Sequence, residues 1–473
     1  MPVLAGWLGA GGRKPLVLRG ARQVGKSTAV RLFAEEAGLD LLEVNLERHR
    51  DLDGVFGSFD VGVVLDNLSA LGGKRVHERT LLFLDEIQAA PQAIACLRYF
   101  YENRPGLPVI AAGSLLEFAL SKKAFPMPVG RITYHYMQPM CFSEFLAAVD
   151  PAALEWLDRV GTDAPMPEQA HKRLTKLQRQ FMLVGGMPEA VACFAATGDF
   201  AQVASIQQGI LNTCIEDFAK YARQKDLADL QRLFRTLPVH LGRKTVYARL
   251  LPDSTSAHSR ALLDLLIKAQ VATPVYAADC AGTPLRAGMD ERHFKLLFLD
   301  VGLVTRLLGH DMLDIVNADE RSMVNEGPLA EQFIGQHLYL DERHESPPES
   351  FYWLNSAKNA NAEVDFVVAQ GRLMVPVKVK AGKSGSLKSL HYFCGIRHLA
   401  HAVRFDLLPA SVQRIQTSIV RKGDDPVLAD YQLHSLPLYA VEKLPQLLSA
   451  LRSTGRRFCL RLGGSAGRLI DAG

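Results

Sequence analysis

Eight consecutive residues near the start of the chain carry the clearest chemical signal. Gly20, Gly25, Lys26 and Ser27 occupy the fixed positions of the pattern G-x-x-x-x-G-K-[ST]. An apolar strand pattern precedes them and a helical pattern follows, which is the context that this motif requires. In such a loop the backbone N–H groups surround a phosphate, the lysine neutralises the β- and γ-phosphates, and the serine hydroxyl ligates Mg²⁺.

This loop predicts a site for ATP and Mg²⁺, although a glycine turn that only joins a strand to a helix is the plainer alternative. The predicted nucleotide contacts in the loop are Gly20, Ala21, Arg22, Gln23, Val24, Gly25, Lys26, Ser27 and Thr28.

An acidic pair follows a second apolar strand pattern. Asp85 and Glu86 come directly after the run Leu81 to Leu84. Ligands of parallel sheets bind at the carboxyl ends of the strands. We expect Asp85 to hold Mg²⁺ through water and Glu86 to polarise the attacking water. The pair could instead simply begin a helix, an interpretation that the nearby Lys26 loop weakens.

Two weaker candidates end or follow a third strand pattern. Ser114 closes the run PVIAAGS and is placed to touch the γ-phosphate or the lytic water, as is Gln88. Arg131 follows the next loop and is a candidate to reach a phosphate in the same chain or in a neighbouring copy. Taken alone, Arg131 is more simply a solvent-facing arginine.

The order of the patterns predicts the fold class. Strand patterns alternate with helical ones from Lys14 to Ser114, which indicates an α/β parallel sheet. A helix followed by two strands between Val246 and Asp300 is the order of a winged helix, and Gln370-Gly371 predicts a hairpin farther on. We predict a P-loop domain at 1–150, a helical and winged-helix region at 151–318, an α/β domain at 319–440 and a peripheral tail at 441–473.

The composition of the 473 residues excludes several classes of protein. Lys and Arg number 54 against 50 Asp and Glu, and 48% of residues are apolar, so the chain is globular and not strongly polycationic. The seven scattered cysteines form no C-x-x-C pair, which favours reduced thiols. No run approaches the roughly 18 apolar residues of a membrane span. We therefore expect a soluble, cytoplasmic protein without a membrane partner.

Six motifs, in this order, resemble those of a bacterial and archaeal group of AAA-type ATPases: GARQVGKST, LLFLDEIQ, AAGSLLEF, PVGRI, GGMPEAV and FKLLFLDVGL. The resemblance spans about residues 14–410. It implies an ATPase core, a helical and winged-helix region, and a C-terminal domain similar to PD-(D/E)XK nucleases. By position, it makes Lys26 and Ser27 the phosphate and Mg²⁺ contacts, Asp85 and Glu86 the second acidic motif, and Arg131 a sensor or finger.

The chemistry of PD-(D/E)XK nucleases needs an acid, then a carboxylate and a lysine two residues apart on the next strand. Asp365 fits the first position and Glu331 is a candidate upstream acid. Lys378 stands where the second carboxylate belongs, two residues before Lys380. Glu363 shares a strand face with Asp365 but would still face Lys378. Because a lysine there opposes metal binding, we expect this domain to have lost the hydrolysis of DNA.

A nuclease-like fold retained for binding is the favoured alternative, with Lys378, Lys380 and Lys383 against a phosphate backbone. Basic residues also flank the predicted winged helix, diluted by Asp253 and Asp264: Arg243, Lys244, Arg249, His258 and Arg260. DNA contact there competes with a packing or oligomerisation role.

Three functions stay open at this point. The first is an ATP-hydrolysing switch that acts on DNA or a protein partner, as a single chain or a homo-oligomer. The second is an ATP-regulated DNA nuclease that uses Glu331, Asp365 and Lys380. The third is a nucleotide-binding scaffold without hydrolysis, which has no use for the acid at Glu86.

Overall fold

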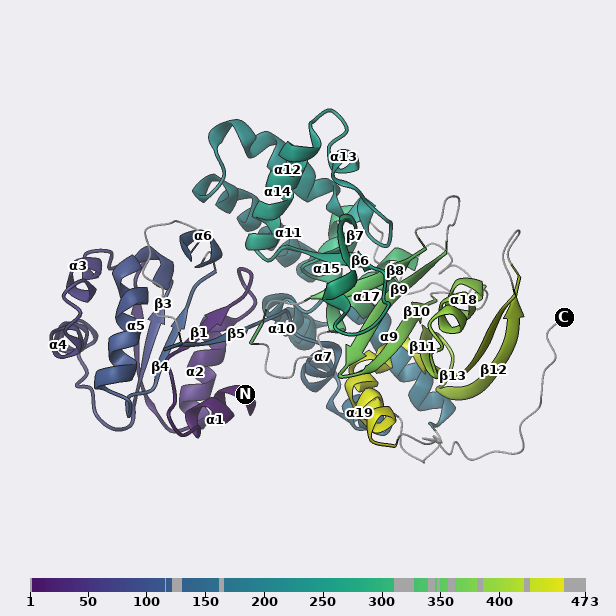
Figure 1. The fold of residues 1–473 in the computed structure, drawn as a ribbon. Helices are drawn as coiled ribbons and strands as arrows, with labels where there is room; N and C mark the ends of the chain where they lie inside the picture. The colour runs from purple at the N-terminus through teal and green to yellow at the C-terminus, as the bar shows by residue number, and fades with distance from the viewer. Residues whose placement is uncertain are drawn as a thin grey trace.

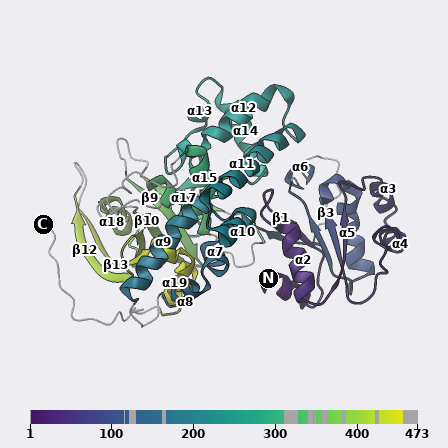
Figure 2. The same cartoon turned by 180° about the vertical axis from the view of Figure 1, so that it is seen from behind.

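The computed structural model describes residues 2–114, 116–120, 130–160, 166–309, 327–338, 345–346, 349–355, 362–380, 386–420 and 426–454. Figure 1 shows an N-terminal α/β domain at one end, a second sheet at the other, and a helical region that joins them. The view from behind in Figure 2 shows the same division. Within the described ranges, no helix combines the length and apolar character that a membrane crossing requires.

The N-terminal domain is a parallel sheet in the order β2-β3-β4-β1-β5. Its strands are β1 (Leu16–Arg19), β2 (Asp40–Asn45), β3 (Thr80–Asp85), β4 (Val109–Ala112) and β5 (Thr133–Tyr136). Every residue of β1, β3 and β4 is buried, because apolar clusters cover both faces of the sheet. This confirms the predicted parallel α/β class for the N-terminal domain.

The helices of this domain connect the strands and cover the sheet (Figure 1). They are α1 (Pro2–Leu8), α2 (Lys26–Glu36), α3 (Leu52–Phe56), α4 (Val61–Gly72), α5 (Pro91–Asn103) and α6 (Leu116–Leu120), with a 3₁₀ turn, η1, at Ile87–Ala89. Asp60 caps α4 by accepting the N–H groups of Gly62 and Val63.

The middle region is helical up to Lys268. It comprises α7 (Phe142–Val149), α8 (Pro151–Asp158), α9 (Glu168–Val184), α10 (Pro188–Thr197), α11 (Phe200–Asp217), α12 (Leu227–Thr236), α13 (Tyr247–Leu250) and α14 (Ser256–Lys268), with 3₁₀ turns η2 (Phe218–Lys220), η3 (Gln224–Asp226) and η4 (Leu237–His240). The buried side chains of these helices share one apolar core with much of the C-terminal sheet.

The second sheet has the order β12-β13-β11-β10-β9-β8-β6-β7. Its strands are β6 (Ala272–Ala278), β7 (Met289–Phe298), β8 (Ser350–Leu354), β9 (Glu363–Gln370), β10 (Leu373–Val379), β11 (His401–Asp406), β12 (Ser411–Ile419) and β13 (Val427–Pro437). The helices and 3₁₀ turns that accompany this sheet are α15 (Val301–Leu308), α17 (Gly327–His337), α18 (Lys388–Ile396), α19 (Leu444–Thr454), η5 (Leu285–Gly288) and η7 (Leu438–Lys443). The predicted hairpin at Gln370-Gly371 joins β9 to β10.

Two of the predicted domain borders do not coincide with the borders in the structure. The strand pair β6 and β7, expected as part of a separate winged helix, belongs to the C-terminal sheet, because β6 pairs in parallel with β8. The border at 318/319 therefore divides a single sheet. The expected tail from 441 is also packed as far as it is described, since Val441, Leu444 and Leu448 are buried in the main core.

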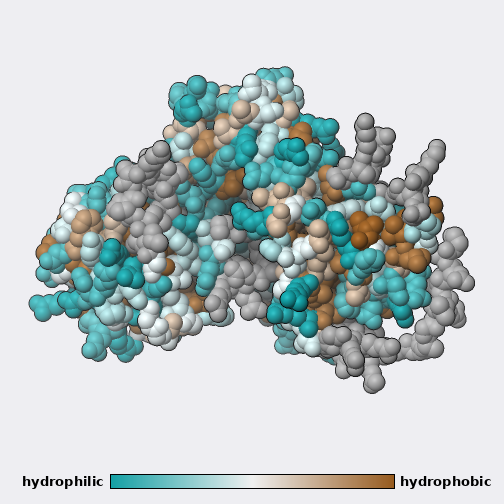
Figure 3. Space-filling model, viewed as in Figure 1, coloured by the Kyte–Doolittle hydropathy of each residue, from teal (hydrophilic) through white to brown (hydrophobic). Residues whose placement is uncertain are grey.

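The outer surface is mostly hydrophilic in the view of Figure 3. Apolar side chains gather over the end formed by α18, β12 and β13 (Figure 3). Leu428 and Val420 near this end are 75% and 70% exposed.

One buried carboxylate joins the helical region to the start of α15. Asp300 is fully buried, and its Oδ1 accepts the N–H of Gly186 at 2.6 Å. Its Oδ2 accepts the N–H groups of Gly302 and Leu303 at 3.0 and 3.2 Å and so caps α15. Burial raises the pKa of Asp300 to about 6, although these backbone donors oppose the shift. The turn at Gly185-Gly186 thus depends on a residue more than a hundred positions away.

We expect Asp300→Ala to lower the free energy of unfolding by about 3 kcal/mol, because three buried N–H groups lose their acceptor. Thermal unfolding measures this loss. Asp199→Ala is the matched control, since Asp199 also caps a helix but is not buried, and it should cost only about 1 kcal/mol. Equal losses in the two variants would contradict the role of Asp300 as a tie between segments.

Candidate nucleotide-binding site

The loop between β1 and α2 has a backbone that its glycines permit. Gly20 has φ +155°, and a Cβ atom there would lie 2.6 Å from the carbonyl oxygen of Met137. Gly25 has φ +91° and directly precedes α2. A Cβ atom at Gly25 would lie 3.3 Å from Cγ of Pro188, the first residue of α10. The loop is therefore packed against the helical region as well as against its own domain.

Lys26 is folded over this loop. Its Nζ donates to the carbonyl oxygens of Gly20 at 3.0 Å and Ala21 at 2.8 Å, and the residue is only 8% exposed. Burial lowers the pKa of Lys26 to about 8, against the opposing attraction of Glu86 and Asp85. An anionic phosphate is a stronger acceptor than two neutral carbonyls, so the ammonium is well placed to transfer its hydrogen bonds to one.

The sheet brings the predicted Mg²⁺ contacts together. Ser27 Oγ donates to Oδ2 of Asp85 at 3.1 Å, from the start of α2 to the end of β3. Burial and the neighbouring Glu86 raise the pKa of Asp85, while the Ser27 hydroxyl lowers it. A hydroxyl and a carboxylate oxygen are the ligand types that Mg²⁺ prefers. These two residues fit the ion that the loop motif implies.

Glu86 lies beside this pair in a backbone conformation with φ +51°. Its Oε2 accepts a short hydrogen bond from Nε2 of Gln88. Positive φ is uncommon for residues other than glycine and concentrates at functional sites. The side chain of Glu86 is thus held by the amide of Gln88 at the carboxyl end of β3.

Two buried polar atoms near the end of β4 have no hydrogen-bond partner among the described residues. They are Oγ of Ser114, which is 6% exposed, and Oε1 of Gln88. A Cβ atom on Gly113 would lie 2.1 Å from that Gln88 oxygen, so the two segments touch. Because buried polar groups are normally paired, these atoms are candidates to contact a phosphate or a water molecule.

Arg131 lies away from this site. It precedes β5, whose Thr133 pairs with Leu16 at the start of β1, so Arg131 is at the sheet edge opposite the loop. Its Nε donates to Oε1 of Glu102 at 3.0 Å, and its guanidinium lies 5.8 Å from the ring centre of Tyr101. The geometry therefore conflicts with a phosphate contact within the same chain. A contact in a neighbouring copy stays a prediction.

We expect Arg131→Ala to leave MgATP turnover unchanged in dilute solution, because its side chain faces the wrong edge of the sheet. Phosphate release should be measured over a range of chain concentrations. A loss of at least about tenfold that appears only where the chain self-associates would assign Arg131 to a neighbour's site. A loss in the monomeric chain would contradict the placement.

One contact of the loop had no signal in the sequence. Arg22 forms an ion pair with Asp217, at 2.5 Å between Nε and Oδ2. Lys220 also approaches Asp217, at 3.0 Å. Asp217 is the last residue of α11 and is 6% exposed. The side chain of a predicted phosphate-loop residue is thus held by the helical region.

The predicted nuclease and DNA-contact residues lie elsewhere in the molecule. Lys378 on β10 donates to Oδ1 of Asp365 on β9 at 2.7 Å. The lysine therefore binds the carboxylate oxygen that a metal ion would need as a ligand. Among the basic residues near α14, Arg260 is paired with Glu291 and His258 contacts Asp229. Lys383 lies outside the described residues.

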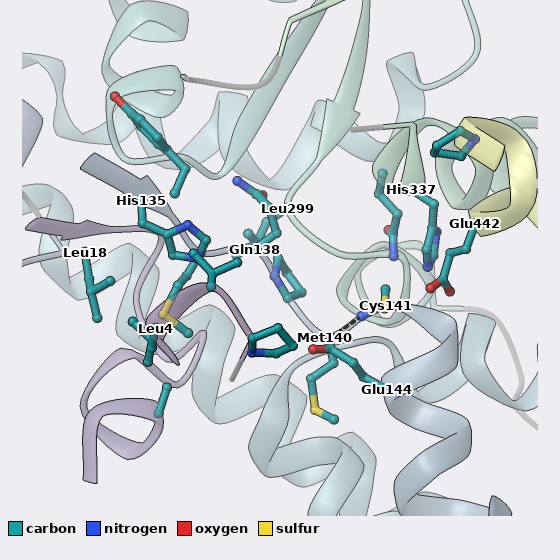
Figure 4. Close-up of a pocket in the computed structure, with 18 residues that line it drawn as sticks. Leu4, Leu18, His135, Gln138, Met140, Cys141, Glu144, Leu299, His337 and Glu442 are labelled. Atoms are coloured by element: carbon teal, nitrogen blue, oxygen red, sulfur yellow. Dashed lines mark hydrogen bonds between the residues drawn. The ribbon is translucent and has the colours of Figure 1, made fainter. Parts of the chain in front are cut away.

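A cavity of about 440 Å³ lies between the N-terminal domain and the C-terminal region. Figure 4 shows Leu4 and His135 on one side of it and His337 and Glu442 on the other. His337 Nε2 accepts the N–H of Phe142 at 3.0 Å, and Glu442 accepts two hydrogen bonds from Ser143. The phosphate loop and the acidic pair do not line this cavity, which is distinct from the nucleotide site.

Comparison with protein families agrees with this geometry. Residues 12–146 match a family described as an AAA domain. The N-terminal domain is of the AAA type. Residues 175–314 and 326–430 match two domains of unknown function, DUF8612 and DUF4143. The match confirms the AAA part of the resemblance, while the winged-helix and nuclease-like folds stay predictions. No curated protein matches the chain.

Solved structures resemble the chain only loosely. The ORC2 protein of Aeropyrum pernix, in ADPNP–ADP complexes, is 14% identical over 67% of this chain and 91% of its own, with a TM-score of 0.27. AMPPCP-bound DnaA of Aquifex aeolicus is 10% identical over 57% and 85%, with a TM-score of 0.23. VC1899 of Vibrio cholerae is 9% identical over 93% and 98%, with a TM-score of 0.19. Likenesses at this level carry no argument about this chain.

Proposed function

We propose that this chain binds and hydrolyses MgATP, and that the nucleotide cycle changes how the helical region meets the AAA domain. The observation that carries the proposal is the meeting of Lys26, Ser27, Asp85 and Glu86 at one edge of the parallel sheet. This change of conformation acts on a DNA or protein partner.

Each residue has a distinct role in this proposal. The N–H groups of the loop and the ammonium of Lys26 bind the phosphates. Ser27 and Asp85 hold the Mg²⁺, which when bound stabilises the charge on the transferred phosphoryl group. Glu86 accepts the proton of the attacking water, while Gln88 keeps its carboxylate in place. Ser114 orients the γ-phosphate or that water from the end of β4.

The coupling to the helical region rests on the contacts of the loop itself. Arg22 is bound by Asp217. A bound phosphate competes with Asp217 for the guanidinium. Pro188 packs against Gly25, so a shift of the loop also reaches α10.

The proposal is tested by measuring phosphate release from MgATP by the purified chain, with and without duplex or single-stranded DNA. Turnover supports hydrolysis, and stimulation by DNA supports DNA as the partner. Binding of ATP without turnover would favour the scaffold instead. An absence of ATP binding at millimolar concentration would refute the site.

The ATP-regulated nuclease is the second candidate, favoured by the carboxylates Glu331, Glu363 and Asp365 that meet in the C-terminal sheet. It would require Lys380 beside a bound metal. DNA cleavage with Mg²⁺ that is lost in Asp365→Ala would establish it.

A further inference from the structure

The C-terminal carboxylates surround a lysine that sequence patterns did not single out. Lys295 on β7 is 2% exposed, and its Nζ lies 3.1 Å from Oε2 of Glu331 and 3.2 Å from Oε1 of Glu363. The same atom lies 3.7 Å from Oδ1 of Asp365. One ammonium thus contacts acids on both α17 and β9.

The remaining oxygens of Asp365 are also engaged. Oδ1 accepts a hydrogen bond from Nζ of Lys378 at 2.7 Å, and Oδ2 accepts the backbone N–H of Val379 at 2.8 Å. The ring of Tyr352 covers Lys295, with its centre 5.5 Å from Nζ. Lys295 and Asp365 therefore lie inside the protein, between β7, β8, β9, β10 and α17, while Glu363 stays partly exposed.

The carboxylates of this group and the Lys295 ammonium stabilise one another's charged forms. Burial by itself lowers the pKa of Lys295, but the attraction of Glu331, Asp365 and Glu363 outweighs burial and raises that pKa above its ordinary value. Burial and repulsion by Asp365 raise the pKa of Glu331 to about 7, while Lys295 opposes the rise. The carboxylates depend on the ammonium, because buried like charges destabilise one another without a cation between them.

We propose that the Lys295 ammonium is the resident cation of this carboxylate cluster and takes the place that a divalent metal ion would otherwise fill. Carboxylates from separate elements that converge on one point are the ligands of a hard divalent cation. Here the point is occupied by an ammonium tethered to β7. With the ammonium in place, no set of three or more His, Cys, Asp and Glu in the described part of the chain is arranged to hold a metal ion.

This assignment has two consequences that do not depend on ATP hydrolysis. Lys295 ties β7, which precedes residue 318, to α17 and β9, which follow it, so the cluster holds the C-terminal sheet together across the predicted border. The cluster also holds a latent cation site that removal of the ammonium would expose. Lys378 reinforces Asp365 from the other side.

The test is Lys295→Met in the full, nucleotide-free chain, followed by thermal unfolding in EDTA and in millimolar Ca²⁺. In EDTA we expect Tm to fall by about 10 °C, because the buried Asp365 and the partly buried Glu331 and Glu363 lose the ammonium that they share. Ca²⁺ should restore about half of that loss, since its coordination is large and adaptable. The wild-type Tm should not respond to Ca²⁺.

Lys443→Met is the matched control. Lys443 forms one ion pair, 2.9 Å from Asp158, whose side chain is 66% exposed. Its loss should lower Tm by at most about 2 °C without any response to Ca²⁺.

A second variant covers the case in which Lys295→Met does not fold. Lys295→Met combined with Glu331→Gln removes one charge of each sign, and we expect it to fold and to lose most of the response to Ca²⁺. The proposal is overturned if Lys295→Met is as stable as wild type in EDTA, or folds but ignores Ca²⁺. It is also overturned if the double variant is no better than the single one, or if wild type binds Ca²⁺ stoichiometrically in calorimetry and Asp365→Asn abolishes that binding.

Discussion

Lys26→Ala is expected to reduce MgATP turnover by at least about 100-fold. The buried ammonium is held by the loop carbonyls and lies close to Asp85 and Glu86, where it can neutralise charge on the β- and γ-phosphates. Alanine keeps the helix but removes this charge, so ATP binding should weaken together with turnover. Phosphate release and the binding of a fluorescent ATP analogue measure the two effects separately.

Lys74→Ala is the control for this variant. Lys74 is an exposed lysine of the same domain whose ammonium contacts only the carbonyl oxygen of Leu41 among the contacts described. Its removal should leave turnover and unfolding unchanged. Undiminished phosphate release by a folded Lys26→Ala chain would refute the assignment of the nucleotide site.

Glu86→Gln should separate binding from chemistry. We expect phosphate release to fall by about 100-fold or more, because the amide cannot accept a proton from water. The near-identical shape of glutamine preserves the end of β3, so affinity for MgATP should change by less than about threefold. Single-turnover measurements with excess chain would show bound ATP that persists.

Gln88→Ala is the companion variant for Glu86. Because Gln88 holds the carboxylate in place and does not accept the proton, its loss should slow release less than Glu86→Gln does. Normal turnover in Glu86→Gln would show that another group activates the water. The nucleotide site would then stand, but Glu86 would not be its catalytic base.

The variants of Lys26, Glu86 and Lys295 probe separate parts of the molecule. The first two act on the AAA domain, whereas Lys295→Met acts on a cluster in the C-terminal sheet. A failure of the ATPase proposal therefore leaves the Lys295 proposal standing, and the reverse also holds.

The amino-acid sequence by itself determined the local parts of the nucleotide site. The loop residues Gly20 to Ser27 are adjacent along the chain, and their types define both the turn and the start of α2. Asp85 and Glu86 come at the end of an apolar run that forms a buried parallel strand. Because parallel strands present their carboxyl ends to one edge, the sequence predicts Ser27 and Asp85 at the same edge of the sheet, and the folded sheet brings them into contact.

Only the tertiary structure decided which distant residues meet. Arg131 follows the third strand pattern in sequence, but its position before β5 puts it at the sheet edge opposite the loop. Arg22 meets Asp217, and Lys295 meets Glu331 and Asp365, through pairings that leave no periodic or spaced pattern. Local sequence encodes strand, helix and turn. Contacts between remote segments depend instead on how whole elements pack, and this packing decides both where the Lys295 ammonium meets its carboxylates and where the domain borders fall.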